Sequence, residues 1–156
     1  MAGLSERQIA IVRSSWARVV PTADLAARLF YGRLFTTHPG LRHLFHADID
    51  RQGEKLVATL DAVVGNLDRM DDILPTARAL AIRHVGYGVE PWQYAPVGAA
   101  LLWMIEQIMG REFTLEVAEA WRAAYGAVSG AMVDAAYPDA PRTASVPFAR
   151  PATASP

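Results

Sequence analysis

The chain has 156 residues, of which 52% are apolar and 20% charged, and its formal net charge is −1. This composition predicts one globular domain and excludes a disordered or fibrous chain. The charge gives no basic surface for nucleic acid, and a sequence without cysteine excludes disulfides, thiolate chemistry and iron–sulfur clusters. No signal peptide is recognisable, and the longest apolar run, residues 97–105, is too short to cross a bilayer. We therefore expect a soluble, cytoplasmic protein without stable membrane insertion.

Helical periodicity dominates the N-terminal half of the sequence. Ser5 begins the first predicted helix, and Gln8, three residues later, completes a capping box. A second helix begins at Thr22 or Asp24 and reaches about residue 37, a short third one ends near residue 45, and a fourth begins near residue 51. The expected core consists of the apolar stripes of these helices: Ile9, Val12, Trp16 and Val19; then Leu25, Leu29, Phe30, Leu34 and Phe35; then Leu56, Leu60, Val63 and Leu67.

Three more helices are predicted in the C-terminal half. The first covers residues 74–89, with Pro75 in its first turn, where proline is tolerated, and Gly86 weakening its end. A long helix then ends at Gly110, and Thr114 caps the last helix. Because no segment shows a convincing strand pattern, we predict an all-α chain of about seven helices.

The last 19 residues, 138–156, differ from the rest of the chain. They hold five of the ten prolines and many Ala, Ser and Thr residues. Such a segment cannot bury enough apolar surface to offset the entropy of ordering it. We therefore predict a domain of residues 1–137 followed by a flexible tail.

Three polar side chains interrupt the apolar stripes: His84, Tyr31 and Gln52. An ordinary explanation is that His84 bonds to a backbone carbonyl and that Tyr31 and Gln52 satisfy each other or nearby backbone. The alternative is that His84 belongs to a site for something large and flat, and that Tyr31 and Gln52 face a cavity and donate hydrogen bonds to a bound polar ligand. The other histidines lie in or beside the short third helix and are expected at the surface: His38, His43 and His46.

A series of short motifs extends in order over residues 4–137. They are Leu29-Phe30-Tyr31-Gly32-Arg33-Leu34-Phe35, His38-Pro39, Leu44-Phe45, Gln52 with Leu56, Ile73-Leu74-Pro75, Arg83-His84, Gly88-Val89, Tyr94 with Val97-Gly98, Leu101-Leu102, Ala120-Trp121 and Ala124-Tyr125-Gly126. Together they resemble the globin domains of bacterial single-domain haemoglobins and flavohaemoglobins. The resemblance implies a globin fold that encloses a haem pocket, with haem b (iron protoporphyrin IX) as the cofactor.

The resemblance also implies roles for residues that would contact the haem or its distal ligand. Phe45 would pack on the porphyrin, and Val89 would touch it from the loop after the proximal helix. Tyr31 and Gln52 would donate hydrogen bonds to dioxygen, which carries partial negative charge when bound, and Leu56 would form an apolar wall. Dioxygen, NO and CO are the expected ligands.

On the proximal side the resemblance implies His84 as the iron ligand and Tyr94 as its neighbour. In flavohaemoglobin-type domains a glutamate of the last helix acts with this tyrosine on the proximal imidazole, but Ala136 stands at its position here. Asp134 lies two residues earlier, about 200° away around a helix. We therefore expect His84 to donate to a backbone carbonyl near Leu80, as an ordinary neutral imidazole.

These residues favour reversible oxygen binding at an iron that can be pentacoordinate, for storage, delivery or sensing, with no catalytic side chain. The alternative is a nitric oxide dioxygenase, which oxidises NO to nitrate and must have its iron reduced again. Flavohaemoglobins use fused flavin and NAD domains for this step, so the present chain would depend on a separate flavin reductase. A third hypothesis is a helical sensor or interaction module without haem, in which His84 is only structural.

Overall fold

A computed structural model describes residues 4–44, 48–86 and 91–136 of the chain. Over these ranges the structure consists of helices and contains no strand, which confirms the all-α prediction. The α-helices are α1 (Glu6–Val19), α2 (Ala23–Thr37), α3 (Ile49–Gly65), α4 (Met70–Gly86), α5 (Tyr94–Met109) and α6 (Leu115–Ala136). Short 3-10 helices lie between them: η1 (Val20–Thr22), η2 (Pro39–Leu44), η3 (Leu67–Arg69), η4 (Pro91–Gln93) and η5 (Gly110–Glu112).

Local signals set several helix ends as expected. The Ser5 hydroxyl accepts from the backbone N–H of Gln8 at 3.0 Å, and the Gln8 side chain accepts from the Ser5 backbone N–H at 2.9 Å, so the capping box is present. Gly110 follows α5 with φ of 59°, a left-handed value that favours glycine. The Thr114 hydroxyl accepts from the Val117 N–H at 3.3 Å at the start of α6.

The predicted third α-helix is instead the 3-10 helix η2. It contains only six residues and begins with Pro39 and Gly40, the two residue types least suited to an α-helix. In the described ranges, six α-helices therefore replace the predicted count of about seven, and η2 takes the place of the predicted third helix.

The start predicted for α4 is also wrong. The helix begins at Met70, so Pro75 is its sixth residue and not part of its first turn. Asp71 and Asp72 occupy the first turn, where carboxylates interact favourably with the helix dipole. Pro75 has no N–H to bond to the Asp71 carbonyl, so one backbone hydrogen bond is missing. The helix nevertheless includes the five residues that precede Pro75.

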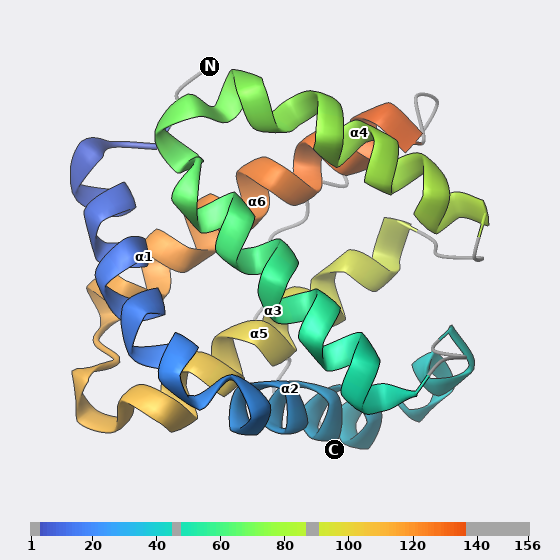
Figure 1. Cartoon of the computed structure of the whole chain (residues 1–156), viewed down its shortest axis with the longest axis horizontal. Helices are drawn as coiled ribbons and strands as arrows, with labels where there is room; N and C mark the ends of the chain where they lie inside the picture. The colour runs from blue at the N-terminus through green and yellow to red at the C-terminus, as the bar shows by residue number, and fades with distance from the viewer. Residues whose placement is uncertain (1–3, 45–47, 87–90, 137–156) are drawn as a thin grey trace.

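The main core lies where α1, α2, α5 and α6 meet, with α3 packed across α1 and α2 (Figure 1). On α2 the buried face is formed by Ala26, Phe30 and Leu34, which are spaced four residues apart. Leu25, which the sequence placed in this stripe, is 49% exposed because it lies about 100° around the helix from Ala26.

Helix α4 packs chiefly on α6 and forms a second apolar group, which we call the proximal cluster. Its buried members are Ile73, Ala77, Ala81 and Met132, and its partly buried members include Leu80, Tyr94, Val128 and Ala136. Small alanines on α4 allow the two helices to approach closely along this contact. The proximal cluster fixes the orientation of the helix that carries His84.

Candidate ligand-binding site

Tyr31 and Gln52 are brought together from α2 and α3. The Tyr31 side chain is buried, with 4% of its surface exposed, and its hydroxyl donates to the Gln52 backbone carbonyl at 3.4 Å. Burial raises the pKa of Tyr31 to about 12, so the hydroxyl keeps its proton at neutral pH. Leu56, one turn after Gln52, is partly buried against the main core. The distal pair, as we call Tyr31 and Gln52, therefore consists of a hydroxyl donor that keeps its proton and the residue whose backbone carbonyl it contacts.

Neighbouring rings hold the Tyr31 side chain in place. The Phe30 ring meets it edge-on, with centroids 4.9 Å apart, and the Phe35 ring stacks on it at 5.8 Å. The Arg42 guanidinium lies over the Phe35 ring, 5.0 Å from its centroid. The tyrosine ring is therefore fixed by its own helix and by η2.

Gly53 is a residue of the distal region that the sequence interpretation missed. It is buried in the first half of α3, directly after Gln52. A Cβ atom added to it would lie 2.7 Å from the Cβ of Ala27 on α2, closer than real Cβ atoms come. A glycine inside an otherwise helical pattern is a known sign of close backbone approach, so the signal was present in the sequence.

His84 lies in the last turn of α4, half-buried, with its Nδ1 atom buried. Burial lowers the pKa of His84, a hydrogen bond to the Leu80 backbone acts in the opposite direction, and the Arg83 charge lowers it further. The net effect favours a neutral imidazole at pH 7, which is the form that binds a metal ion. The contribution of Leu80 agrees with the partner expected from the sequence.

Tyr94 begins α5 and packs against the proximal cluster, close to the helix of His84. The Tyr125 hydroxyl of α6 donates to the Tyr94 backbone carbonyl at 2.7 Å, a contact that the sequence interpretation did not include. Ala136 packs against the same cluster, whereas Asp134 is exposed, as its helical position predicts. At the position where flavohaemoglobin-type domains have a glutamate, the described structure therefore places the apolar side chain of Ala136 against this cluster.

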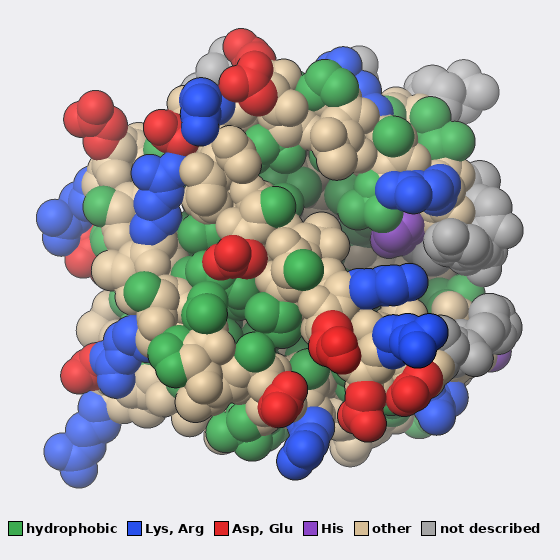
Figure 2. All heavy atoms as spheres, in the orientation of Figure 1, with side chains coloured by type: hydrophobic (Ala, Val, Ile, Leu, Met, Phe, Trp, Pro, Cys, Tyr) green, Lys and Arg blue, Asp and Glu red, His purple; other side chains and the backbone are tan. Residues whose placement is uncertain are grey.

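Two predicted site residues, Phe45 and Val89, lie outside the described residues, as do His46 and the segment 138–156. The described site thus consists of the distal pair with Leu56, and of His84 with Tyr94. Figure 1 shows that the N-terminal end of α3 and the C-terminal end of α4 lie toward the same end of the long axis. Figure 2 shows a hollow on that side of the molecule, with hydrophobic side chains and a histidine at its edge.

The remaining described histidines behave as surface or turn residues. The Nδ1 atom of His38 is 3.0 Å from the Thr37 hydroxyl, and His43 is exposed and contacts the Gly40 carbonyl. No group of three or more His, Cys, Asp and Glu side chains suited to a metal ion occurs within the described ranges. None of the described helices has the length and apolar character needed to cross a membrane.

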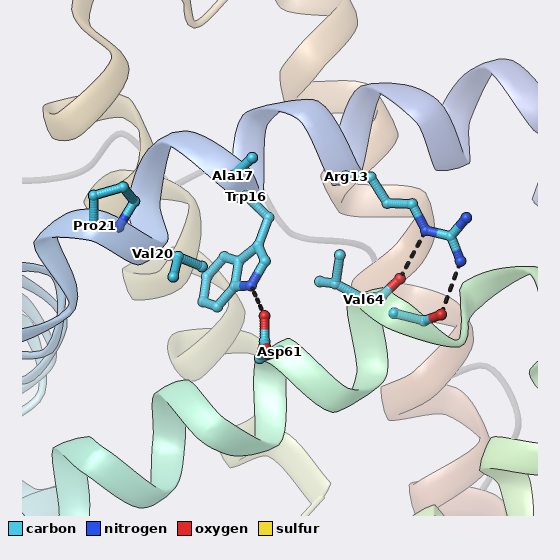
Figure 3. A pocket seen from close by; sticks show the side chains of 8 residues that line it. Arg13, Trp16, Ala17, Val20, Pro21, Asp61 and Val64 are labelled. Atoms are coloured by element: carbon cyan, nitrogen blue, oxygen red, sulfur yellow. Dashed lines mark hydrogen bonds between the residues drawn. The ribbon is translucent and has the colours of Figure 1, made fainter.

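A depression of about 450 Å³ between α1 and α3 is a different feature (Figure 3). The Trp16 indole N–H donates to Asp61 at 2.9 Å, and Arg13 donates to the Val64 carbonyl at 3.1 Å. Arg13 also bonds to the Gly65 carbonyl and to Asp68. These groups satisfy one another across the two helices, so the depression is the outer edge of a helix contact.

Comparison with known proteins relates this chain to a family. The family model for Globin matches residues 28–132. A flavohemoprotein of Bacillus subtilis is 27% identical over 133 residues, and one of Bordetella pertussis is 31% identical over 133 residues. Each alignment covers 83% of this chain and 33% of the relative, so the chain spans about a third of the length of these relatives.

Two solved structures share the arrangement of helices. One is an engineered carbene transferase from Rhodothermus marinus, made from a candidate nitric oxide dioxygenase, with a TM-score of 0.77 and 25% identity. The other is a bacterial globin from Campylobacter jejuni, with a TM-score of 0.74 and 22% identity. The alignments cover 85% of this chain and 93% and 96% of those chains, respectively.

Proposed function

Because this chain belongs to the globin family, we propose that it binds haem b through His84 and uses it for reversible binding of dioxygen. The observation that carries the proposal is the half-buried His84 in the last turn of α4, whose lowered pKa favours the neutral imidazole. Haem supplies an iron centre that binds dioxygen, NO and CO. Storage, delivery and sensing all require this binding.

The proximal residues fit an iron ligand. The ring nitrogen Nδ1 of His84 is buried, so Nε2 is the atom that we expect to face the iron. We expect the Leu80 backbone, whose interaction with the imidazole raises the His84 pKa, to favour one orientation and one tautomer of the ring. Because burial lowers the His84 pKa, the imidazole is neutral at pH 7. A neutral imidazole has a nitrogen lone pair that can coordinate a metal ion.

The distal residues fit a polar diatomic ligand. The Tyr31 hydroxyl bonds to the Gln52 carbonyl at 3.4 Å, well beyond the 2.7–2.8 Å common for O–H···O bonds, so this bond is weak. If the hydroxyl turned from this carbonyl toward a ligand, we expect that only a weak hydrogen bond would be lost. The Gln52 amide provides a second N–H donor, and both donors would slow the loss of dioxygen more than the loss of CO.

The apolar surroundings of the proximal cluster favour a carrier over a peroxidase-like enzyme. A carboxylate that accepts from the proximal imidazole would increase electron density at the iron and favour cleavage of the O–O bond. Ala136 provides no such acceptor, and Asp134 is exposed. We therefore propose reversible binding as the main property of the site.

Absorption spectra of the purified protein test the proposal. We expect a haem spectrum in the ferric state, a five-coordinate spectrum after reduction with dithionite, and a shift of the Soret band when CO is added. A protein that stays colourless after growth and purification with added haem would contradict the proposal. That outcome would favour the hypothesis of a helical module in which His84 is structural.

Nitric oxide dioxygenation is a second candidate, and the flavohemoprotein relatives favour it. The reaction combines NO and dioxygen to form nitrate and needs one electron per turnover, so we propose that a separate flavin reductase would act as the partner. An NO electrode tests this in the presence of dioxygen, NADH and a bacterial flavin reductase. Sustained NO consumption that requires the reductase and is lost in His84→Ala would support this candidate. A single stoichiometric turnover would contradict it, and oxygen binding would remain as the proposed function.

A further inference from the structure

We propose that Gly53 is a positioning residue, which sets the separation of α2 and α3 and thereby the geometry of the distal pair. The inference rests on the proposed function for its gas-binding consequences. Its structural part concerns only the crossing of two described helices. The absence of a side chain at residue 53 would then be a requirement of the distal site as well as of packing.

The crossing leaves no space for a methyl group on α3. A Cβ atom at Gly53 would lie 2.7 Å from the Cβ of Ala27, whereas non-bonded carbon atoms prefer about 3.5–4.0 Å. Both atoms are attached directly to helical backbone, so neither can rotate away. An alanine at residue 53 must therefore move the helices apart by about 1 Å at this point.

The distal pair lies at this same crossing. Gln52 precedes Gly53, and Tyr31 follows Ala27 by one helical turn on the same face of α2. The added Cβ atom would lie 3.9 Å from Cε2 of the Tyr31 ring, in ordinary contact. The bond from the Tyr31 hydroxyl to the Gln52 carbonyl is already 3.4 Å long, so a further 1 Å would break it.

The Tyr31 ring cannot follow α3 when that helix moves. Phe30 and Phe35, both on α2, hold the ring in its present orientation. Gln52, on α3, would move with its own helix. A wider crossing would therefore separate the two residues from each other, and at least one of the two donors from a ligand that both would contact in the proposed function.

The chain offers a matched control. Gly32 lies on α2 directly after Tyr31, is exposed, and has no atom within 4 Å of an added Cβ. Gly32→Ala therefore adds the same methyl group to a helix, next to the same tyrosine, without touching α3. A second control is the exchange Ala27→Gly with Gly53→Ala, which moves the methyl group from α2 to α3 and restores the space.

The first measurement uses the haem-loaded protein. We expect Gly53→Ala to speed dioxygen dissociation by several-fold to about ten-fold, as for one lost hydrogen bond, with a much smaller change for CO. The exchange variant should return to within two-fold of the wild-type rate, and Gly32→Ala should not change it. Equal changes for both gases, or an unrestored dioxygen rate in a folded exchange variant, would overturn the inference.

The second measurement does not require haem. Crystal structures of Gly53→Ala and of the exchange variant report the distance from the Tyr31 hydroxyl to the Gln52 carbonyl. We expect it to exceed 4 Å in the first and to return to hydrogen-bond distance in the second. An unchanged distance in Gly53→Ala overturns the inference whether or not haem binds, whereas a colourless wild-type protein contradicts only the proposed function. If Gly53→Ala does not fold, the exchange variant carries the test: a folded protein with the Tyr31–Gln52 distance at hydrogen-bond length supports the inference, and a failure to fold or a distance above 4 Å overturns it.

Discussion

The distal and proximal regions of this molecule are built in different ways. On the distal side, α2 and α3 cross so closely at Gly53 that only hydrogen fits, and the Tyr31 hydroxyl meets the Gln52 backbone at that crossing. On the proximal side, α4 packs along α6 through alanine and methionine, and His84 is the polar group at the end of the contact. The distal crossing depends on the exact distance between α2 and α3 at one point. The proximal contact instead extends over several apolar residues of α4 and α6.

The difference shows which property each region controls. A long apolar contact holds a helix in place without adding charge, so it determines where the imidazole lies and leaves its electronic state ordinary. A tight crossing with two donors determines how strongly a polar ligand is retained, because hydrogen-bond strength falls steeply with distance. In the proposed function, the proximal region therefore anchors the cofactor and the distal region sets ligand lifetime.

Removing the anchor should have the largest effect. We expect His84→Ala to lose stable haem binding, with recovery when imidazole is added, because no other described histidine has a comparable apolar setting. Absorption spectra after desalting measure the haem that remains. His38→Ala, in which the ring beside Thr37 is removed, serves as the control and should retain haem. An unchanged reduced spectrum in His84→Ala would mean that another residue holds the iron.

Changing the distal donors should leave haem binding intact and shorten ligand lifetime. Tyr31→Phe and Gln52→Leu each remove one donor to a ligand with partial charge, worth about 1.5–3 kcal/mol. Dioxygen dissociation should therefore speed up by about ten-fold or more in each variant, as measured by stopped-flow spectroscopy. CO should respond much less because it is less polar when bound. Similar effects on both gases would indicate steric blocking in place of hydrogen bonding.

Adding a carboxylate should make the proximal region resemble that of a peroxidase. Ala136→Glu places an acid against the cluster that contains Tyr94, so we expect a higher iron–histidine stretching frequency in resonance Raman spectra of the ferrous protein. Ala136→Gln controls for side-chain size. Asp134→Asn should leave the wild-type frequency unchanged because Asp134 is exposed. A high frequency in the wild type that falls in Asp134→Asn would move the enzyme hypothesis ahead of the carrier.

The smallest effect should be the dependence of haem-free stability on pH. The pKa of folded His84 is lowered from the unfolded value of 6.5, so the unfolded state binds the proton more tightly. The stability linked to His84 is therefore complete above pH 6.5 and decreases as the pH falls from 6.5 toward the folded pKa. One proton changes the free energy of unfolding by at most about 1.4 kcal/mol per pH unit.

Urea unfolding at pH 7.5 and 5.5 measures this dependence. The loss of stability at pH 5.5 should be smaller in His84→Gln than in the wild type, because the substituted side chain does not titrate. Identical losses in the two proteins would show that burial of His84 does not perturb its titration.

The sequence by itself determined the features that depend on local geometry. The capping box at Ser5, the end of α5 at Gly110 and the last-turn position of His84 follow from interactions within a few residues. The helical class and most core stripes follow from periodicity, since one face of each helix must be buried. These signals survive in a single sequence because the atoms concerned are close together along the chain.

Only the tertiary structure decided which groups meet across helices. The partner of Tyr31 is a backbone carbonyl of α3, and the space between α2 and α3 depends on Gly53 and Ala27, 26 residues apart in the sequence. The bond between Tyr125 and Tyr94 joins α6 to α5 in the same way. Distances between such residues result from the packing of whole helices, and every backbone carbonyl is chemically alike in the sequence. Local patterns therefore predict the candidate residues, while packing determines their contacts.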